Sequence, residues 1–193
     1  MRIVVSGTHA SGKSTLVSDL ALALPGYDQL PDPFELVDDD GDPAGAASFV
    51  QQLLVAAERL AELPPGTDVV AERGPVDLLA YLAALADLGR RSAAPDLLAR
   101  LRATTAEAMA HVDLLVVLPL ESPDGIRVPD DEDPDLRGAM EERLLELVDD
   151  PDLVGPATRV VEVAGPPEAR LEQVLAAVAG QEASHRSPGG PRS

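Results

Sequence analysis

The sequence predicts an α/β domain in which helices cover both faces of a mostly parallel sheet of about five strands. Short apolar segments typical of buried parallel strands alternate with longer segments whose apolar residues recur at helical spacing. The first apolar segment leads into a glycine-rich turn and then into a helical pattern. Most of the apolar content is Ala, Leu and Val, with two Tyr, two Phe and no Trp. Such side chains suit helices packed on a sheet, so we expect three layers, α/β/α.

The order of these segments predicts one domain and a tail. Strands are expected at residues 2–6, 27–30, 68–71, 113–118 and 158–163. Helices are expected at residues 14–24, 44–63, 75–89, 94–110, 137–148 and 167–179. Pro and Gly residues end the first two helices. The domain spans residues 1–179 without an internal repeat, and the composition of residues 180–193 predicts a disordered tail.

Charge and composition argue against several classes of function. The formal net charge is −19, which disfavours nucleic-acid and anionic-membrane partners because both need a basic surface. The chain has no cysteine, so disulfides and thiolate metal sites are excluded. The N-terminal residues show neither a charged leader nor an apolar segment of transmembrane length. We therefore expect a cytoplasmic protein without a membrane or nucleic-acid partner, and the sequence leaves its oligomeric state open.

The turn after the first predicted strand has the pattern Gly-x4-Gly-Lys-Ser. It consists of Gly7, Thr8, His9, Ala10, Ser11, Gly12, Lys13 and Ser14, with Thr15 following. In this P-loop, or Walker A motif, small residues let the backbone wrap a phosphate with its N–H groups, and the following helix adds its positive end. Lys13 is expected to reach the β- and γ-phosphates and the Ser14 hydroxyl to hold Mg²⁺. A glycine-rich turn without a ligand is the alternative, and the His9 side chain either contacts phosphate or substrate or faces solvent.

Lys13 is the only lysine of the chain, since the other basic residues counted with it are all arginines. Guanine-binding P-loop proteins need an Asn-Lys-x-Asp segment, so a conventional guanine site is not expected. The AAA+ and helicase branches usually show a strand that ends in Asp-Glu and a further domain. The nearest strand here ends in Glu72-Arg73, and no second domain is expected. This acid–arginine pair at the carboxyl end of a strand instead resembles that of the nucleoside and nucleotide kinases.

Four segments together resemble one family. They are Ser6 to Leu16, the pattern Glu72-Arg73…Asp77…Ala80-Tyr81, the stretch Asp124-Gly125-Ile126-Arg127, and Val163 to Leu171. Up to about Gly180, the chain resembles the small AAA-type ATPase and kinase family related to the ribosylnicotinamide kinase domain of the bacterial NAD regulator. That family lies near the thymidylate and deoxynucleoside kinases. The resemblance implies a P-loop NTPase fold and ATP- and Mg²⁺-dependent phosphoryl transfer to a small molecule, without naming the acceptor. The chain departs from the pattern of many members of that family, because it has Glu72 where they have Asp and Gly74 where they have Ser.

The resemblance also implies roles for an acid–arginine pair. Glu72 would lie across from Ser14 and approach Mg²⁺, while Arg73 would offer its planar guanidinium to a phosphate or a substrate oxygen. An ordinary surface ion pair between Glu72 and Arg73 is the alternative. Asp77, one helical turn later, either touches substrate or caps its helix.

Asp32 is the expected catalytic base by resemblance. The segment Pro31-Asp32-Pro33 resembles the Pro-Glu-Pro of deoxynucleoside kinases, whose acid accepts the proton of the attacked hydroxyl. In the alternative, the two prolines fix a turn that Asp32 caps, and Glu35 is the other candidate base.

A proline- and aspartate-rich excursion at about residues 120–138 follows the strand at residues 113–118. This branch of kinases places a mobile lid there, so Arg127 and Arg137 are expected to bring positive charge to the transferred phosphoryl group. Arg143 is the next candidate, and a solvated loop is the alternative. By the same resemblance, the Gly165 region would lie near the adenine.

Two active functions are consistent with these features. The first is a kinase of a nucleoside, a nucleotide or a similar small metabolite, which the lid arginines favour. The second is a regulatory or partner-dependent ATPase without a small-molecule acceptor. An inactive nucleotide-binding protein is a third possibility.

Overall fold

The computed structural model describes residues 1–37, 45–120 and 133–186. Its centre is a five-stranded sheet of order β2-β3-β1-β4-β5, in which every neighbouring pair of strands is parallel. The strands are β1 (Arg2–Ser6), β2 (Asp28–Leu30), β3 (Val69–Glu72), β4 (Leu114–Val117) and β5 (Arg159–Glu162). The predicted fold class is therefore confirmed.

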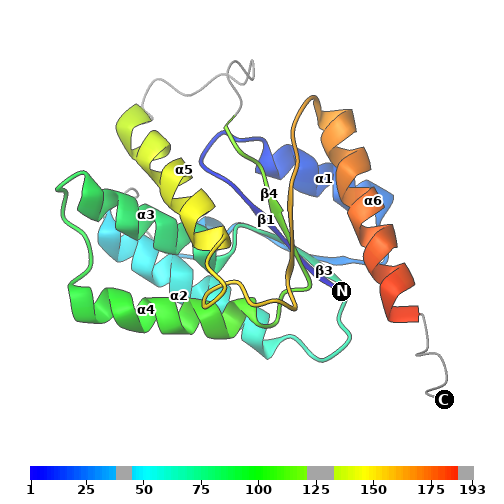
Figure 1. Ribbon diagram of the computed structural model, residues 1–193, viewed down its shortest axis with the longest axis horizontal. Helices are drawn as coiled ribbons and strands as arrows, with labels where there is room; N and C mark the ends of the chain where they lie inside the picture. The colour runs from blue at the N-terminus through cyan, green and yellow to red at the C-terminus, as the bar shows by residue number, and fades with distance from the viewer. Residues whose placement is uncertain (38–44, 121–132, 187–193) are drawn as a thin grey trace.

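Six α-helices and one short 3₁₀ helix connect the strands of the described residues. They are α1 (Lys13–Ala23), η1 (Pro33–Leu36), α2 (Ala46–Glu62), α3 (Pro75–Asp87), α4 (Pro95–Met109), α5 (Pro134–Val148) and α6 (Pro167–Arg186). Helices α1 and α6 cover one face of the sheet, and α2 to α5 cover the other (Figure 1). The chain thus has the three layers that the sequence predicts.

Strand β1 shows why the central strands carry consecutive apolar residues. Ile3 and Val5 pack into the cluster that includes α1 and α6, whereas Val4 packs into the cluster that includes α2, α3 and α5. All three side chains are fully buried, because successive side chains of a strand point to opposite faces and both faces are covered by helices.

The strand order decides which loops meet. Strand β1 lies between β3 and β4, and β2 lies on the outer side of β3. The carboxyl ends of parallel strands share one edge of the sheet, which is where α/β proteins bind ligands. The P-loop after β1, the Glu72-Arg73 pair at the end of β3 and the Asp32 turn after β2 are consequently neighbours.

The C-terminal helix differs from the sequence prediction. Helix α6 does not end at Ala179 but continues to Arg186, so residues 180–186 of the predicted disordered tail are helical. Gln181 explains part of this extension, because its side chain is buried and its Nε2 donates to the Asp113 carbonyl at 2.8 Å. Residues 187–193 lie outside the described residues.

The C-terminal side of the range predicted as a lid also differs from the sequence prediction. Helix α5 begins at Pro134, where Asp133 accepts hydrogen bonds from the amides of Asp135 and Leu136. A capped start of this kind places residues 134–138 in a regular helix. Residues 121–132, including Arg127, lie outside the described residues. In the part of the chain that the structure describes, no helix combines the length and the apolar character needed to cross a membrane.

Candidate active site

The P-loop has a backbone that suits glycine at two positions. Gly7 has φ 154°, and a Cβ there would lie 2.6 Å from Ser11 Oγ and 2.8 Å from the Leu118 carbonyl oxygen. Gly12, with φ 93° and ψ 16°, is the N-cap of α1. Ala10 is also left-handed, at φ 52°, a conformation that costs a residue with a Cβ about 1 kcal/mol. The loop is thus closely folded before any ligand binds.

Lys13 is buried inside this loop. Its Nζ donates to the Thr8 carbonyl at 2.6 Å, and the residue is only 4% exposed. Burial, and secondarily the positive charge of Arg73, lower the pKa of Lys13 to about 8, although Asp77, Asp32 and Glu72 act in the opposite direction. An ammonium held in this way is placed to bind a polyphosphate, which would restore its full charge.

Ser14 and Glu72 meet across the sheet edge. The Ser14 hydroxyl donates to Glu72 Oε1 at 2.6 Å, and both groups lie where solvent reaches them. Hydroxyl and carboxylate oxygens are the donor types that Mg²⁺ prefers beside the oxygens of a bound phosphate. The two residues therefore fit the magnesium site expected from the sequence.

Arg73 binds Asp32 rather than its sequence neighbour Glu72. The Arg73 Nε lies 3.0 Å from Asp32 Oδ2, and both side chains are largely buried. Burial alone would lower the pKa of Arg73, but the carboxylate of Asp32 and other nearby acidic groups raise it overall, so the guanidinium stays charged. The backbone of Arg73 is left-handed, at φ 63°, a strained conformation of the kind that clusters at functional sites.

Asp32 also caps a turn, as one of the two interpretations of the sequence proposes. Its Oδ1 accepts from the amide of Phe34 at 3.0 Å, at the start of η1. The Pro31 carbonyl accepts from Arg59 Nη1 at 2.8 Å, which ties this turn to α2. Glu35, the other candidate base, is exposed.

Asp77 joins the start of the P-loop to the start of α3. Its Oδ2 accepts from Ser6 Oγ at 2.6 Å and from the Gly74 amide at 2.9 Å, while Oδ1 accepts from the Gly7 amide at 2.8 Å. Burial raises the pKa of this carboxyl, and Lys13 opposes that effect. Asp77 therefore caps its helix, and it also holds the phosphate loop, a role that the sequence does not predict.

Gly74 has no room for a side chain such as that of serine. A Cβ at this position would lie 2.7 Å from Val4 Cγ1, well inside van der Waals contact. Val4 is fully buried in the sheet and cannot move aside cheaply. The close approach of Val4 on the neighbouring strand thus favours glycine at this position.

Two stacked aromatic rings lie beside the loop. The rings of Phe49 and Tyr81 are 4.6 Å apart between centroids and 15° from parallel, and the Arg73 guanidinium carbon is 5.7 Å from the Tyr81 centroid. The Tyr81 hydroxyl accepts from the His9 amide at 3.0 Å, and the His9 side chain is exposed. This stack links α2, α3 and the P-loop in one contiguous wall next to Asp32 and Arg73.

Two arginines contact the carbonyls of the loop. Arg137 of α5 donates Nε to the His9 carbonyl at 3.0 Å and Nη2 to the Ala10 carbonyl at 3.4 Å. Arg170 of α6 donates Nη1 to the Ser11 carbonyl at 2.8 Å. Arg143, the next lid candidate, instead pairs with Asp87 and Glu146.

Several of these contacts carry little or no signal in the sequence. The Gly74-x-x-Asp77 spacing is that of a helix-capping box, which identifies the cap but not the bonds to Ser6 and Gly7. Tyr81 follows Asp77 by one helical turn and so shares its face, which could have indicated it. Nothing local to Arg170 indicates that its partner is in the P-loop.

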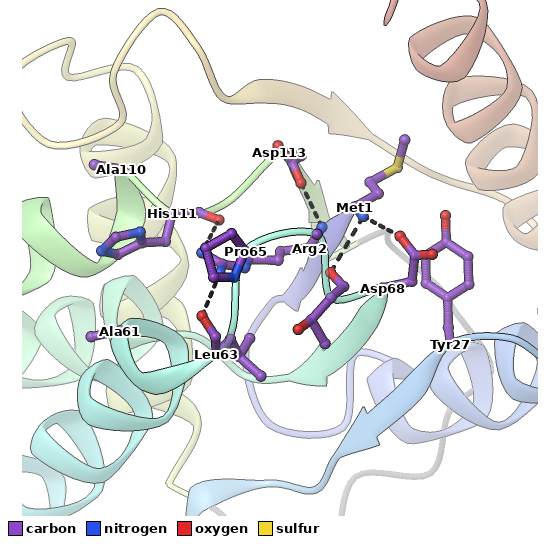
Figure 2. Close-up of a pocket in the computed structure, with 12 residues that line it drawn as sticks. Met1, Arg2, Tyr27, Ala61, Leu63, Pro65, Asp68, Ala110, His111 and Asp113 are labelled. Carbon is purple, nitrogen blue, oxygen red and sulfur yellow. Dashed lines mark hydrogen bonds and ion pairs between the residues drawn. The ribbon is translucent and has the colours of Figure 1, made fainter.

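A hollow of about 770 Å³ opens at the opposite, amino-terminal edge of the sheet (Figure 2). Its polar groups bind one another: the Arg2 amide donates to Asp113 Oδ2 at 2.6 Å, and Arg2 Nη2 donates to the Leu63 carbonyl at 2.7 Å. None of the predicted site residues lines it. The site described above is therefore at the other end of the strands.

The fold and the loop define a P-loop nucleotide-binding protein. The model of the AAA domain family matches residues 2–170, so the chain belongs to this family. No curated protein matches the sequence.

Solved structures of kinases share the fold. Deoxyadenosine kinase from M. mycoides with products dCMP and a flexible dCDP bound is similar at TM-score 0.70 and 14% identity, covering 93% of this chain and 100% of that one. Thymidylate kinase from Candida albicans is similar at TM-score 0.65 and 18% identity, covering 94% and 92%. The NadR protein in complex with NR is similar at TM-score 0.65 and 18% identity, covering 100% of this chain and 53% of that one. The family resemblance expected from the sequence is thus confirmed. At identities of 14% and 18%, the similarity to these solved structures is one of fold.

Proposed function

We propose that this protein transfers the γ-phosphate of ATP to a hydroxyl group of a nucleoside, a nucleotide or a similar small metabolite. The observation that carries the proposal is the Arg73–Asp32 ion pair, at 3.0 Å, which joins the residues after β3 and β2 beside the P-loop. A regulatory ATPase needs a phosphate loop and a metal site, but it has no need of a carboxylate and a guanidinium prepared for a second substrate.

The nucleotide half of the proposal uses the P-loop and the end of β3. The amides of the loop and the Lys13 ammonium would bind the β- and γ-phosphates. Ser14 and Glu72 would hold Mg²⁺, which supplies charge neutralisation between the phosphates when it is bound. The burial of Lys13 in a region of low dielectric strengthens its attraction for the phosphates.

The acceptor half uses Asp32 and Arg73. Asp32 would orient the acceptor hydroxyl and take its proton, as the hydroxyl oxygen forms a bond to the γ-phosphorus and the bond to the bridging oxygen of ADP breaks. Arg73 would hold Asp32 in place and offer a donor to a substrate oxygen.

The predicted lid arginines complete the proposed mechanism. Arg137 already lies against the loop through the His9 carbonyl, and Arg127 belongs to the same excursion of the chain. We assign Arg127 to the stabilisation of charge on the transferred phosphoryl group, whereas the described hydrogen bonds of Arg137 go to the carbonyls of the loop. The kinases of similar fold are named for nucleoside and nucleotide acceptors, which supports testing these classes first.

An acceptor screen tests the proposal. Purified protein is incubated with ATP and Mg²⁺ and with single nucleosides, nucleoside monophosphates or ribosylnicotinamide, and both ADP release and phosphorylated product are measured. We expect slow ATP turnover alone and a product whose formation depends on one acceptor class. Rapid hydrolysis that no acceptor changes would instead favour the partner-dependent ATPase. Matched variants Asp32→Asn and Glu35→Gln then show which acid serves the acceptor.

A further inference from the structure

The outward side of the phosphate loop is held at three consecutive carbonyls. Arg137 binds the carbonyls of His9 and Ala10, and Arg170 binds the carbonyl of Ser11. Each arginine is the fourth residue of its helix, α5 for Arg137 and α6 for Arg170. Two helices on opposite faces of the sheet, both far from the loop in the sequence, thus reach the same short segment of backbone from outside.

Holding a carbonyl sets the direction of the next amide. The peptide unit is planar and trans, so its C=O and N–H groups point in opposite directions. When the carbonyls of His9, Ala10 and Ser11 point to the arginines, the amides of residues 10, 11 and 12 point to the other side of the loop. That side is where a P-loop binds phosphate.

We infer that Arg170 and Arg137 form an outer brace that aims these three amides before a nucleotide arrives. The left-handed conformation of Ala10 supports this reading, because an unrestrained alanine would leave it, and Arg137 holds the carbonyls on both sides of that residue. A loop already folded in its binding conformation loses less conformational entropy on binding. The inference rests on the proposed function only in requiring that the loop binds phosphate.

Arg170 is the more buried of the two arginines that form the brace. It is 6% exposed, and a buried guanidinium is costly unless it has partners or a nearby anion. Helix α6 has other attachments to the sheet, because Val174, Ala177 and Val178 are buried in its core cluster and Arg159 Nη1 donates to the Ala177 carbonyl at 3.1 Å. Arg170 is therefore not needed simply to dock the helix.

The test compares Arg170→Met with Arg159→Met, which removes an arginine-to-carbonyl bond to the same helix but away from the loop. ADP and inorganic pyrophosphate are titrated calorimetrically without an acceptor, well below the melting temperature. We expect Arg170→Met to weaken both affinities about tenfold or more, and Arg159→Met to stay within about twofold of the wild type. Hydrogen exchange of residues 7–15 in the nucleotide-free protein should accelerate in Arg170→Met alone.

The two possible failures are distinguishable. If Arg170→Met binds pyrophosphate and exchanges its loop amides as the wild type does, the brace is refuted even where the variant melts earlier. If Arg170→Met does not fold, Arg137→Met removes the other member of the brace, and wild-type affinity and exchange in that variant refute the brace equally. If the wild type binds pyrophosphate but phosphorylates no acceptor, the kinase proposal is contradicted and the brace is not. If the wild type binds neither ADP nor pyrophosphate, the kinase proposal and the brace are both overturned.

Discussion

Replacing Lys13 with Met removes the only lysine of the chain, and with it an ammonium that burial keeps partly discharged near pH 8. In the folded protein the pKa of Lys13 is lowered to about 8, whereas the unfolded chain has the ordinary value of 10.5. Between these two values the unfolded state binds more protons than the folded state. The free energy of unfolding of the wild type must therefore rise as the pH increases through this range.

The size of this rise follows from the two pKa values. The difference between 10.5 and about 8, at about 1.4 kcal/mol for each pH unit, corresponds to about 3 kcal/mol. Below pH 8 the folded protein bears the full free-energy cost of burying the charged ammonium. Above pH 10.5 this cost is gone, because Lys13 is neutral in both the folded and the unfolded state. Met fills nearly the same volume as the lysine stem and does not titrate, so the variant lacks this rise.

Urea unfolding of the nucleotide-free protein, followed by circular dichroism at a series of pH values from 7.5 to 11, measures the effect. The comparison is clean because the chain has no cysteine and no second lysine, and the two tyrosines are present in both proteins. The difference in unfolding free energy between wild type and Lys13→Met should change by about 3 kcal/mol in favour of the wild type across this range. Parallel pH profiles, or a change of opposite sign, would refute the burial of a protonatable Lys13.

Four substitutions test individual residues of the site. Asp77→Asn should lower the free energy of unfolding, measured by urea denaturation, by about 2–4 kcal/mol, because three donors lose their buried carboxylate acceptor. A loss under about 0.5 kcal/mol would contradict the described hydrogen bonds of Asp77. Gly74→Ser should cost about 1–3 kcal/mol through its clash with Val4, and a melting temperature unchanged from the wild type would show that the strand yields. Once an acceptor is known, Asp32→Asn should reduce kcat about 100-fold or more while Glu35→Gln stays within about twofold; the reverse order would move the base to Glu35.

The parts of the fold that were predicted from sequence are those set by local pattern. The P-loop is a contiguous run from Gly7 to Ser14, and its residue types are required by the backbone they must adopt. The strands were identified because burial on both faces demands an unbroken apolar segment, as in β1 and β4. The predicted end of α6 was wrong because it was based on the polar composition of residues 180–193. The buried contact of Gln181 with the Asp113 carbonyl, which helps to hold this part of the helix, corresponds to no local pattern in the sequence.

The sequence by itself determined the α/β sheet and the P-loop motif at Gly7–Ser14, and the unique Lys13 and the Glu72-Arg73 pair indicated a kinase-like branch. Only the tertiary structure decided which groups act together: Arg73 with Asp32, Tyr81 with the His9 amide 72 positions away, and Arg170 with Ser11 across 159 positions. Such contacts depend on strand order and helix docking. Those are set by the burial of the whole core rather than by any short segment, so they become visible only when the chain is folded.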